Sequence, residues 1–435
     1  MLNIAFWMIG TLIAVLSPII LIHEFGHFLL AKLAGVRVEE FGFGFPPRML
    51  GLWYGKGYLD IENTRVTIPA GFRLPNNLAT GMYVEAVVEE RRGTLRLRRI
   101  ALTGPEMTVA MPCNLGERAM RGLVTTLERG TLYSLNWLPM GAFVRMTGEE
   151  SPDDPRGLAA QPKRWRTAIL SAGAIINIIA AVVLMSGAYL SGIPDGWLVE
   201  ITDVEANGAA AVAGLEPGDV VVALDGHRIT DGVGELQEFV HARPNQEITL
   251  TILRDGERLQ LSAVPRLQSG GYGMLGIVIA DWPDRSALIH YSLPEAFQAG
   301  MTDIRTIIAA MAQLPFRIAQ GSVAPQDVRP TGMVGISQVL TFSLQQAIEW
   351  KMLFPILQTA GLISLALGLT NLLPLPGLDG GRIVFVLIET IRGRRVSPEL
   401  EATVHAVGMI LMIGLALLML VQDFANPIIP WSLLQ

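Results

Sequence analysis

The chain has 435 residues, of which 51% are hydrophobic and only 17% charged, and its formal charge is −6. Typical soluble domains carry about 25% charged residues, so this composition favours a protein embedded in a membrane. The absence of a basic excess excludes nucleic acid as an expected partner. The single Cys113 excludes an intramolecular disulfide and a CxxC site, and we expect it to be a small buried residue.

Four stretches reach the length of about 20 apolar residues that crosses a bilayer. Lys and Arg follow the first stretch, precede the second and lie between the third and fourth, and none precedes the first or follows the fourth. The positive-inside rule then predicts outside termini, with about residues 35–163 and 391–400 in the cytoplasm. The first stretch has no basic n-region and is longer than a signal peptide, so we interpret it as a retained span. The four spans run from about Ile4 to Leu30, Thr167 to Leu190, Leu353 to Leu373 and Ala402 to Val421.

The first span contains the sequence "LIHEFGHFLL", residues 21–30. His23 and His27 are four residues apart, so they lie on one helix face and both can bind the same metal ion. Glu24 can reach a water bound to that metal, as in the H-E-x-x-H pattern of zinc proteases. A chance match or a hydrogen-bonded histidine pair is the alternative, but ionisable residues inside a span are costly and favour a functional role.

A polar, β-leaning insertion at about 55–133 follows, in which "MYVEAVVEE", "TLRLRRIALTG" and "EMTVAM" alternate in part. This pattern predicts a small sheet. The stretch "YSLNWLPMGAFVRM", residues 133–146, predicts a hairpin around Pro139 and Gly141 that lies against the membrane surface. An ordinary hairpin without that location is the alternative.

Between the second and third spans, "GAAAVAGLEPGDVVVALDG" and the turns at Asp225-Gly226 and Asp255-Gly256 resemble a PDZ domain over about 196–267. Such a domain implies a groove for an extended peptide or a chain end. The groove is alternatively filled by the protein itself, or the domain is a spacer. Beyond it, apolar residues spaced by three and four predict an amphipathic helix, either on the outer membrane surface or packed on the domain. These residues are Phe297, Met301, Ile304, Ile308 and Met311.

A zinc site needs a third protein ligand, and "TNLLPLPGLDGGR", residues 370–382, offers the best candidate. Its prolines and glycines break the third span, and Asp379 is its only carboxylate. The first and third spans run in the same direction, so the two histidines and Asp379 are expected at the same, cytoplasmic depth. A helix N-cap for the following "GGRIVFVLIETI" is the alternative role for Asp379.

Together, HEFGH, NLLPLPGLDGG and the PDZ-like stretch resemble the site-2 protease family of intramembrane zinc metalloproteases, in its RseP-like branch. The resemblance implies that His23, His27 and Asp379 bind Zn2+ and that Glu24 is the general base. It further implies cleavage of a transmembrane segment in a membrane-anchored substrate, such as an anti-sigma factor or a signal-peptide remnant. The PDZ domain would admit substrates already trimmed by another protease.

Further matches to the family are weaker. "SAGAIINI" resembles its G-P-x-x-N pattern and implies that Asn177 contacts substrate or stabilises the oxyanion, with interhelical hydrogen bonding as the alternative. Asn371 aligns with a substrate-contacting or loop-bracing asparagine. A strand edge near Gly141 and Phe143 is expected to hold unwound substrate. The chain departs from the family at Ala174, which replaces a proline, in the long insertion, and in "GMVGIS".

The predicted fold class is a polytopic α-helical membrane protein with a β-rich cytoplasmic region and an extracytoplasmic PDZ domain, located in the inner (cytoplasmic) membrane. A catalytically silent PDZ adaptor and a metal carrier or sensor are the competing functions. The predicted segments are a helix at 1–34, a β region at 35–163, a helix at 164–192, a PDZ domain at 193–270, an amphipathic helix and linker at 271–350, a helix at 351–391, and a helix with a tail at 392–435.

Overall fold

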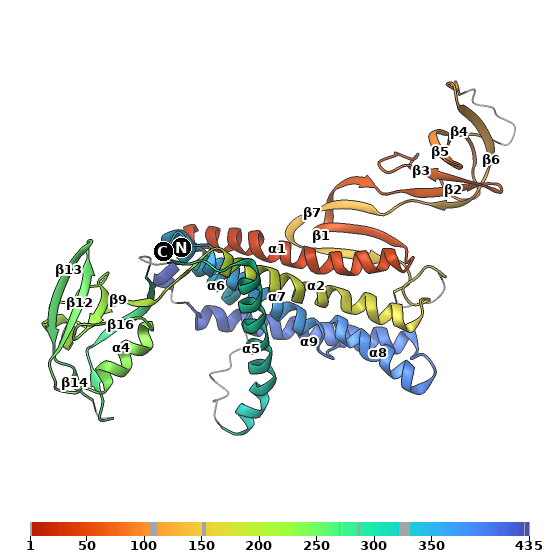
Figure 1. Ribbon diagram of the computed structural model, residues 1–435. Helices are drawn as coiled ribbons and strands as arrows, with labels where there is room; N and C mark the ends of the chain where they lie inside the picture. The colour runs from red at the N-terminus through yellow and green to blue at the C-terminus, as the bar shows by residue number, and fades with distance from the viewer. Residues whose placement is uncertain are drawn as a thin grey trace. The chain divides into compact units, whose positions relative to one another are not determined.

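The computed structural model describes residues 2–104, 111–149, 154–268, 270–284, 288–321, 331–429 and 431–434 (Figure 1). The predicted strand "EMTVAM", residues 106–111, lies almost wholly outside this range. The chain forms two compact units. One comprises residues 1–184, 304–343 and 359–435, and the other 185–303 and 344–358.

Among the described residues, four helices are long and apolar enough to cross a membrane, and they coincide with the four predicted spans. They are α1 (Leu2–Leu33), α2 (Lys163–Leu190), α7 (Phe354–Asn371) and α9 (Pro398–Ala425). The orientation of these helices across a membrane stays a prediction.

Three further helices accompany the spans: α5 (Leu293–Ala319), α6 (Met333–Glu349) and α8 (Asp379–Arg392). The α5 helix is the predicted amphipathic helix, but its apolar stripe is not one buried face, because Ile304 is buried whereas Phe297 and Met311 are exposed. The predicted linker before the third span contains α6. A break of seven residues separates α7 from α8, as the prolines and glycines of 370–382 predict.

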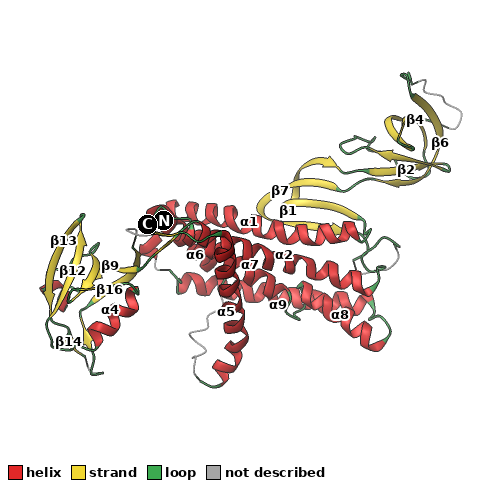
Figure 2. Ribbon diagram, in the orientation of Figure 1, coloured by secondary structure: helices red, strands yellow, loops and turns green. Residues whose placement is uncertain are grey.

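The strands β1 (Val38–Tyr54) and β7 (Leu132–Met146) pair in one sheet beside α1, and both strands bend sharply (Figure 2). Residues 40–43 of β1 pair on one side with 142–145 and on the other with 132–135. The prediction of a hairpin at 133–146 is therefore wrong in its pairing, although the chain does bend between Trp137 and Gly141. Its two arms, 132–136 and 142–146, are separated by β1 and do not pair with each other in the described sheet. Local alternation gave no sign of this, because β1 comes from almost a hundred residues earlier.

The insertion forms a closed barrel with the strand order β2-β3-β5-β4-β6, built around a buried aliphatic core that includes Leu59, Val84 and Leu97. The predicted small sheet is thus closed on itself, and its β3–β5 pair is parallel. Cys113 is exposed, so the prediction of a buried residue is wrong; it lies in the irregular segment before β6 and not in a strand. The strands are β2 (Gly57–Ile61), β3 (Thr64–Ile68), β4 (Tyr83–Arg91), β5 (Thr94–Leu102) and β6 (Glu117–Glu128).

The second unit contains the PDZ-like domain, a six-stranded sheet of order β13-β12-β10-β9-β16, with β11 beside β10. Strand β16 pairs with β9, so the sheet continues to Pro283 and the predicted end at residue 270 is wrong. Its partner strand lies some 75 residues earlier, beyond what local periodicity detects. The elements are β9 (Trp197–Val204), β10 (Val220–Leu224), β11 (His227–Arg228), β12 (Ile248–Arg254), β13 (Glu257–Ala263), β16 (Ile277–Pro283), α3 (Ala209–Val212) and α4 (Gly232–His241).

Candidate active site

The site begins where α1 and α2 approach each other closely. Gly26, the glycine of HEFGH, lies against the backbone of α2: a Cβ atom at this position would be 2.7 Å from the carbonyl oxygen of Ala172. Real Cβ atoms do not come so close to a backbone oxygen, so glycine is required for this helix contact. The contact turns the adjacent His23 and His27 toward the helix interface, where both side chains are buried.

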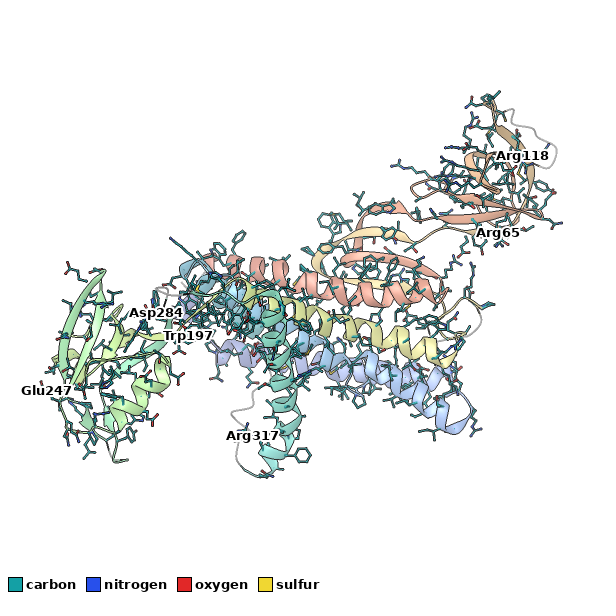
Figure 3. The ribbon with its side chains drawn as sticks, in the orientation of Figure 1. Arg65, Arg118, Trp197, Glu247, Asp284 and Arg317 are labelled. Carbon is teal, nitrogen blue, oxygen red and sulfur yellow. The ribbon has the colours of Figure 1, made fainter. Side chains whose placement is uncertain are left out.

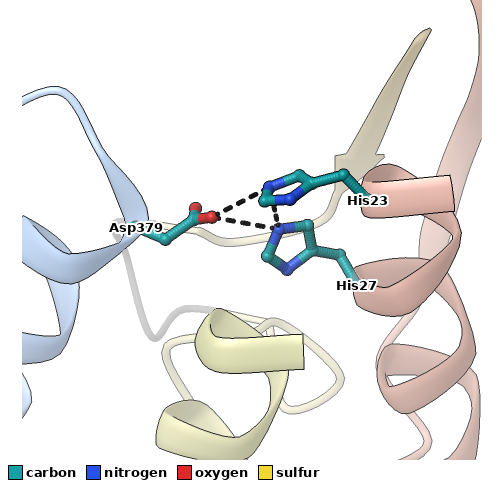
Figure 4. A group of neighbouring side chains, drawn as sticks. All are labelled: His23, His27 and Asp379. Carbon is teal, nitrogen blue, oxygen red and sulfur yellow. Dashed lines mark hydrogen bonds and ion pairs between the residues drawn. The ribbon is translucent and has the colours of Figure 1, made fainter. Parts of the chain in front are cut away.

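His23, His27 and Asp379 come together from α1 and the start of α8 (Figure 4). The Nε2 atoms of the two histidines are 3.2 Å apart, and each is 3.2 Å from Oδ2 of Asp379. In a tetrahedral zinc site with bonds of about 2.0–2.1 Å, neighbouring ligand atoms are about 3.3 Å apart. The three donor atoms therefore match one face of a zinc tetrahedron, which leaves the fourth position for water or substrate.

Gly173 on α2 forms the floor of this cluster. A Cβ atom at position 173 would lie 2.4 Å from Nε2 of His27 and 2.6 Å from Nε2 of His23. Any side chain at position 173 would occupy the space in which a metal ion bound by both nitrogens would lie. The local pattern "SAGAIINI" predicts no role for Gly173, and only the packing of α2 against α1 reveals one.

The Nδ1 atom of each histidine, which does not face Asp379, lies close to a polar atom of α2. Nδ1 of His27 lies 2.7 Å from the carbonyl oxygen of Ile169, which can only accept a hydrogen bond. The proton of His27 is therefore on Nδ1, and its Nε2 lone pair is free for a metal. Nδ1 of His23 lies 3.3 Å from the side-chain nitrogen of Asn177, whose Oδ1 is buried and has no hydrogen-bond partner among the described residues.

Glu24 is not one of the three clustered donors, and its carboxylate is bound by strand β7. Its Oε2 accepts a hydrogen bond of 3.1 Å from the backbone N–H of Val144. Nearer the start of the helix, the Ser17 hydroxyl donates to the carbonyl oxygen of Pro139 and accepts from the N–H of Gly141. The bent strand β7 is thus fixed along α1, with the glutamate carboxylate at its edge.

Asp379 is the first residue of α8, and its carboxylate faces the histidines instead of capping the helix, whose N-cap position is Leu378. Behind it, Gly380 lies against the backbone of Leu373, where a Cβ atom would be 2.1 Å from the carbonyl oxygen. The two glycines of the LDGG sequence therefore let α8 start directly against the preceding turn. That close packing determines where Asp379 is placed.

Helix α9 supports the same loop from its other side. The N–H of Gly377, which has a left-handed φ of 92°, donates a 3.0 Å hydrogen bond to Nδ1 of His405. One turn further along α9, Gly408 packs against Pro376 so closely that a Cβ atom there would be 2.2 Å from the Pro376 Cβ. Neither α9 residue was among the predicted site residues, because nothing in the local sequence links them to the loop.

The other predicted residues lie outside the cluster. Asn371 ends α7, and its side chain donates a 3.0 Å hydrogen bond to the carbonyl oxygen of Leu367, one turn back in its own helix. Gly141 has a left-handed φ of 80° at the bend of β7. Phe143 follows it and packs over Gly42 of the paired strand. The predicted substrate contacts of these residues stay predictions.

Comparison with known families decides the class of the protein. The model of peptidase family M50 matches residues 11–113 and 107–415. The chain belongs to peptidase family M50. Like the family, it is a zinc metalloprotease, so the sequence-based expectation of an enzyme that uses zinc is confirmed.

Relatives match this M50 chain over nearly its full length. A protein of Agrobacterium fabrum is 27% identical over 95% of this chain and 94% of its own length. The zinc metalloprotease RasP of Geobacillus kaustophilus is 27% identical over 94% of this chain and 96% of its own length. The PDZ domain of the SdrC-like protein from Listeria monocytogenes is 19% identical over 20% of this chain and 88% of its own, with a TM-score of 0.18.

Proposed function

We propose that this M50 protein is an intramembrane endopeptidase in which His23, His27 and Asp379 hold zinc and Glu24 is the general base. The proposal rests on one observation: three donor atoms, each 3.2 Å from the other two, lie at the meeting point of α1, α2 and α8. Two imidazoles and one carboxylate are a donor set that catalytic zinc uses, with one position left open.

Zinc bound at this site supplies a Lewis acid that polarises a peptide carbonyl and makes water a better nucleophile near neutral pH. Glu24 accepts the proton of the attacking water and delivers it to the leaving amine, which the glutamate can do without ligating the metal. Its hydrogen bond to Val144 keeps the carboxylate next to the site and orients it.

Asn177 orients His23 in this proposal. With the Nε2 lone pair of His23 given to zinc, the imidazole proton is on Nδ1 and needs an acceptor. The oxygen of Asn177 has no other partner among the residues that the structure describes, so the amide orientation that turns Oδ1 to His23 gives the imidazole proton an acceptor. A role of Asn177 or Asn371 in contacting substrate or the oxyanion remains part of the proposal.

The substrate that suits the site is a transmembrane segment of a membrane-anchored, single-span protein, such as an anti-sigma factor or a signal-peptide remnant. A helical peptide bond is shielded by its own hydrogen bonds, so the segment has to unwind before cleavage. The arm 142–146 pairs with β1 on one side, and its other edge faces Glu24 through Val144. An unwound segment added to this edge, near Gly141 and Phe143, would lie extended beside the base.

We further propose an inner-membrane location with outside termini and an active site near the cytoplasmic side. Lys32 in the last turn of α1 and Arg392 at the end of α8 supply the positive charge expected of cytoplasmic helix ends. The PDZ-like domain would then lie outside and bind a peptide or chain end of a substrate already shortened by another protease.

A silent PDZ adaptor and a metal carrier are the alternatives. Neither needs a general base, so the decisive variant is Glu24→Gln. The protein is co-expressed with a tagged single-span substrate already trimmed on its outer side. We expect wild type to release a shortened fragment and Glu24→Gln to release none while it retains bound zinc. Identical fragments from both would reject the protease mechanism. Unchanged zinc content in both His23→Ala and Asp379→Ala would reject the ligand assignment.

A further inference from the structure

The inserted barrel carries a basic cleft that the protease mechanism does not use. The cleft has a volume of about 470 Å³ and lies between the turn that joins β4 to β5 and the end of β3. Four of its seven lining residues are basic, and no acidic residue lines it among the residues that the structure describes. The polar lining consists of Lys56, Thr67, Arg91, Arg92, Thr94 and Arg96.

The barrel's own topology brings these residues together. The parallel pairing of β3 with β5 places Thr67 beside Arg96. The antiparallel pairing of β4 with β5 places Arg91 opposite Thr94 across a two-residue turn. Lys56 directly precedes β2, the strand next to β3. The cleft is therefore a product of the closed fold and not of one run of basic residues.

Other arginines on the barrel pair with carboxylates, whereas the basic residues of the cleft do not within the described part of the chain. Arg65 pairs with Asp60, Arg98 with Glu89, and Arg99 with Glu117. None of the four basic side chains that line the cleft forms an ion pair within the described part of the chain. Concentrated positive charge without internal compensation favours an external anion.

The turn at the cleft contains an arginine in a backbone conformation that is unusual for this residue type. Arg92 has a left-handed φ of 54° and is followed by Gly93 with a φ of 76°. Tight hairpin turns with both central residues in this conformation strongly favour Asn or Asp before Gly. An arginine at the first position carries a conformational penalty, which is consistent with a use for its guanidinium group.

The segment that precedes the cleft has the side chains expected at a membrane surface. The second half of β1 exposes large apolar and aromatic side chains, and Trp53 and Tyr54 are 50% and 36% exposed only three and two residues before Lys56. Leu50 and Leu52 in the same half-strand are also exposed. Aromatic and basic residues in this succession are typical of the boundary between acyl chains and lipid headgroups. The barrel is tied to this strand, because the N–H of Gly71 donates to the carbonyl oxygen of Tyr54.

We propose that the cleft binds the phosphate group of an anionic phospholipid headgroup and thereby seats the inserted barrel on the membrane surface. Guanidinium groups match phosphate oxygens in bidentate geometry, and the two threonines add hydroxyl donors. The proposal rests on the membrane location in the proposed function, but it does not depend on zinc or on proteolysis. A soluble phosphate compound is the competing source of the same chemistry.

The test uses the full chain in a neutral detergent and counts bound lipids by native mass spectrometry. The probes are short-chain phosphatidylglycerol and the matching phosphatidylcholine. The variants are Arg91→Gln and Arg92→Asn, of which the second keeps a residue suited to the left-handed turn. Arg118→Gln removes an equal charge from an exposed position on the same barrel, outside the cleft, and is the matched control (Figure 3).

We expect one site that prefers phosphatidylglycerol. Each cleft variant should weaken its binding about fivefold, since a basic residue near an anionic surface contributes about 1 kcal/mol. Arg118→Gln should bind as wild type does. Equal binding of both lipids, or equal losses in cleft and control variants, would overturn the proposal. Displacement of the lipid by an equal concentration of inorganic phosphate would assign the cleft to a soluble anion and overturn it too.

This result is separable from the protease proposal. The cleft variants should retain bound zinc, because the cleft residues are not among the groups around His23. Glu24→Gln, in turn, should bind phosphatidylglycerol as wild type does. A failure of one proposal therefore leaves the other measurable.

Discussion

The backbone N–H of Val144 on β7 donates a 3.1 Å hydrogen bond to Oε2 of Glu24 on α1. The bond joins the proposed general base to the edge of the arm 142–146, whose other side is already paired with β1. The group proposed to move the proton and the strand proposed to hold the substrate are thus positioned by one contact. Strand addition at this edge, as proposed above, would place a peptide bond beside the carboxylate.

The floor of the cluster gives the first prediction. Gly173→Ala should abolish zinc binding, because the added methyl group would lie 2.4 Å and 2.6 Å from the two histidine nitrogens. Gly10→Ala on α1 is the matched control, since no other group in the described part of the chain lies within 4 Å of a Cβ there. Metal analysis of the purified proteins measures the effect. Full zinc content in Gly173→Ala would show that the cluster is not the metal site.

The orientation of His23 gives the second prediction. Asn177→Ala removes the acceptor proposed for the Nδ1 proton and should weaken zinc binding about 10- to 100-fold. Asn177→Asp keeps an acceptor oxygen at the same place and should lose much less. Zinc affinity is measured by competition with a chelator of known affinity. Equal losses in the two variants would mean that the amide does not orient the histidine through its oxygen.

The contact of α9 with the loop before Asp379 gives the third prediction. Gly408→Ala places a methyl group 2.2 Å from the Cβ of Pro376, so the loop that leads to Asp379 has to move. We expect reduced zinc content and at least a tenfold loss of substrate cleavage, because a displacement of about 1 Å at a catalytic group costs about 100-fold in rate. Gly414→Ala, with nothing within 4 Å of its Cβ, should behave as wild type. Normal activity of Gly408→Ala would remove α9 from the support of the site.

The bent sheet gives a prediction on pH. Burial raises the pKa of Glu40, but hydrogen bonds from Arg48 and Ser134 outweigh it, and the pKa lies below the ordinary value of 4.5. Because the folded-state pKa is the lower one, the stabilisation is complete above about pH 4.5 and is lost as the pH falls through the folded value.

Hydrogen exchange of residues 38–54 and 132–146 in the full chain measures this effect. Protection in wild type should fall as the pH drops below about 4.5, after correction for intrinsic exchange rates. Glu40→Gln should show lower protection at neutral pH and a flatter pH profile. The same profile in both proteins would mean that another group controls the acid response of the sheet.

The PDZ-like domain gives the last prediction. Arg254 forms a bidentate pair with the buried Asp219, with distances of 2.6 Å and 2.7 Å. Arg254→Met leaves that carboxylate buried without its partner, which should destabilise the domain by about 3–5 kcal/mol. Arg258→Met, at an exposed position on β13, is the control. Hydrogen exchange over β10 and β12 reports the loss, and unchanged protection would contradict it.

Local sequence patterns predict the class of fold and the donor set of the candidate site. Helical spans depend on local hydrophobicity, so the four spans and the break before Asp379 could be predicted from composition and from proline and glycine positions. His23 and His27 could be paired because a helix repeats every 3.6 residues. The expected meeting of Asp379 with these histidines followed from the directions of the spans, and the structure brings the three donor atoms together.

Tertiary structure alone decided what surrounds those residues. Gly173 and Gly408 matter because a second helix or loop lies within contact distance, and no local pattern carries that information. The arms of β7 flank β1 instead of each other, because strand pairing is decided by partners far apart in the chain. The basic cleft exists only because the inserted strands close into a barrel, which brings Lys56 and Arg96 to the lining of the same cleft.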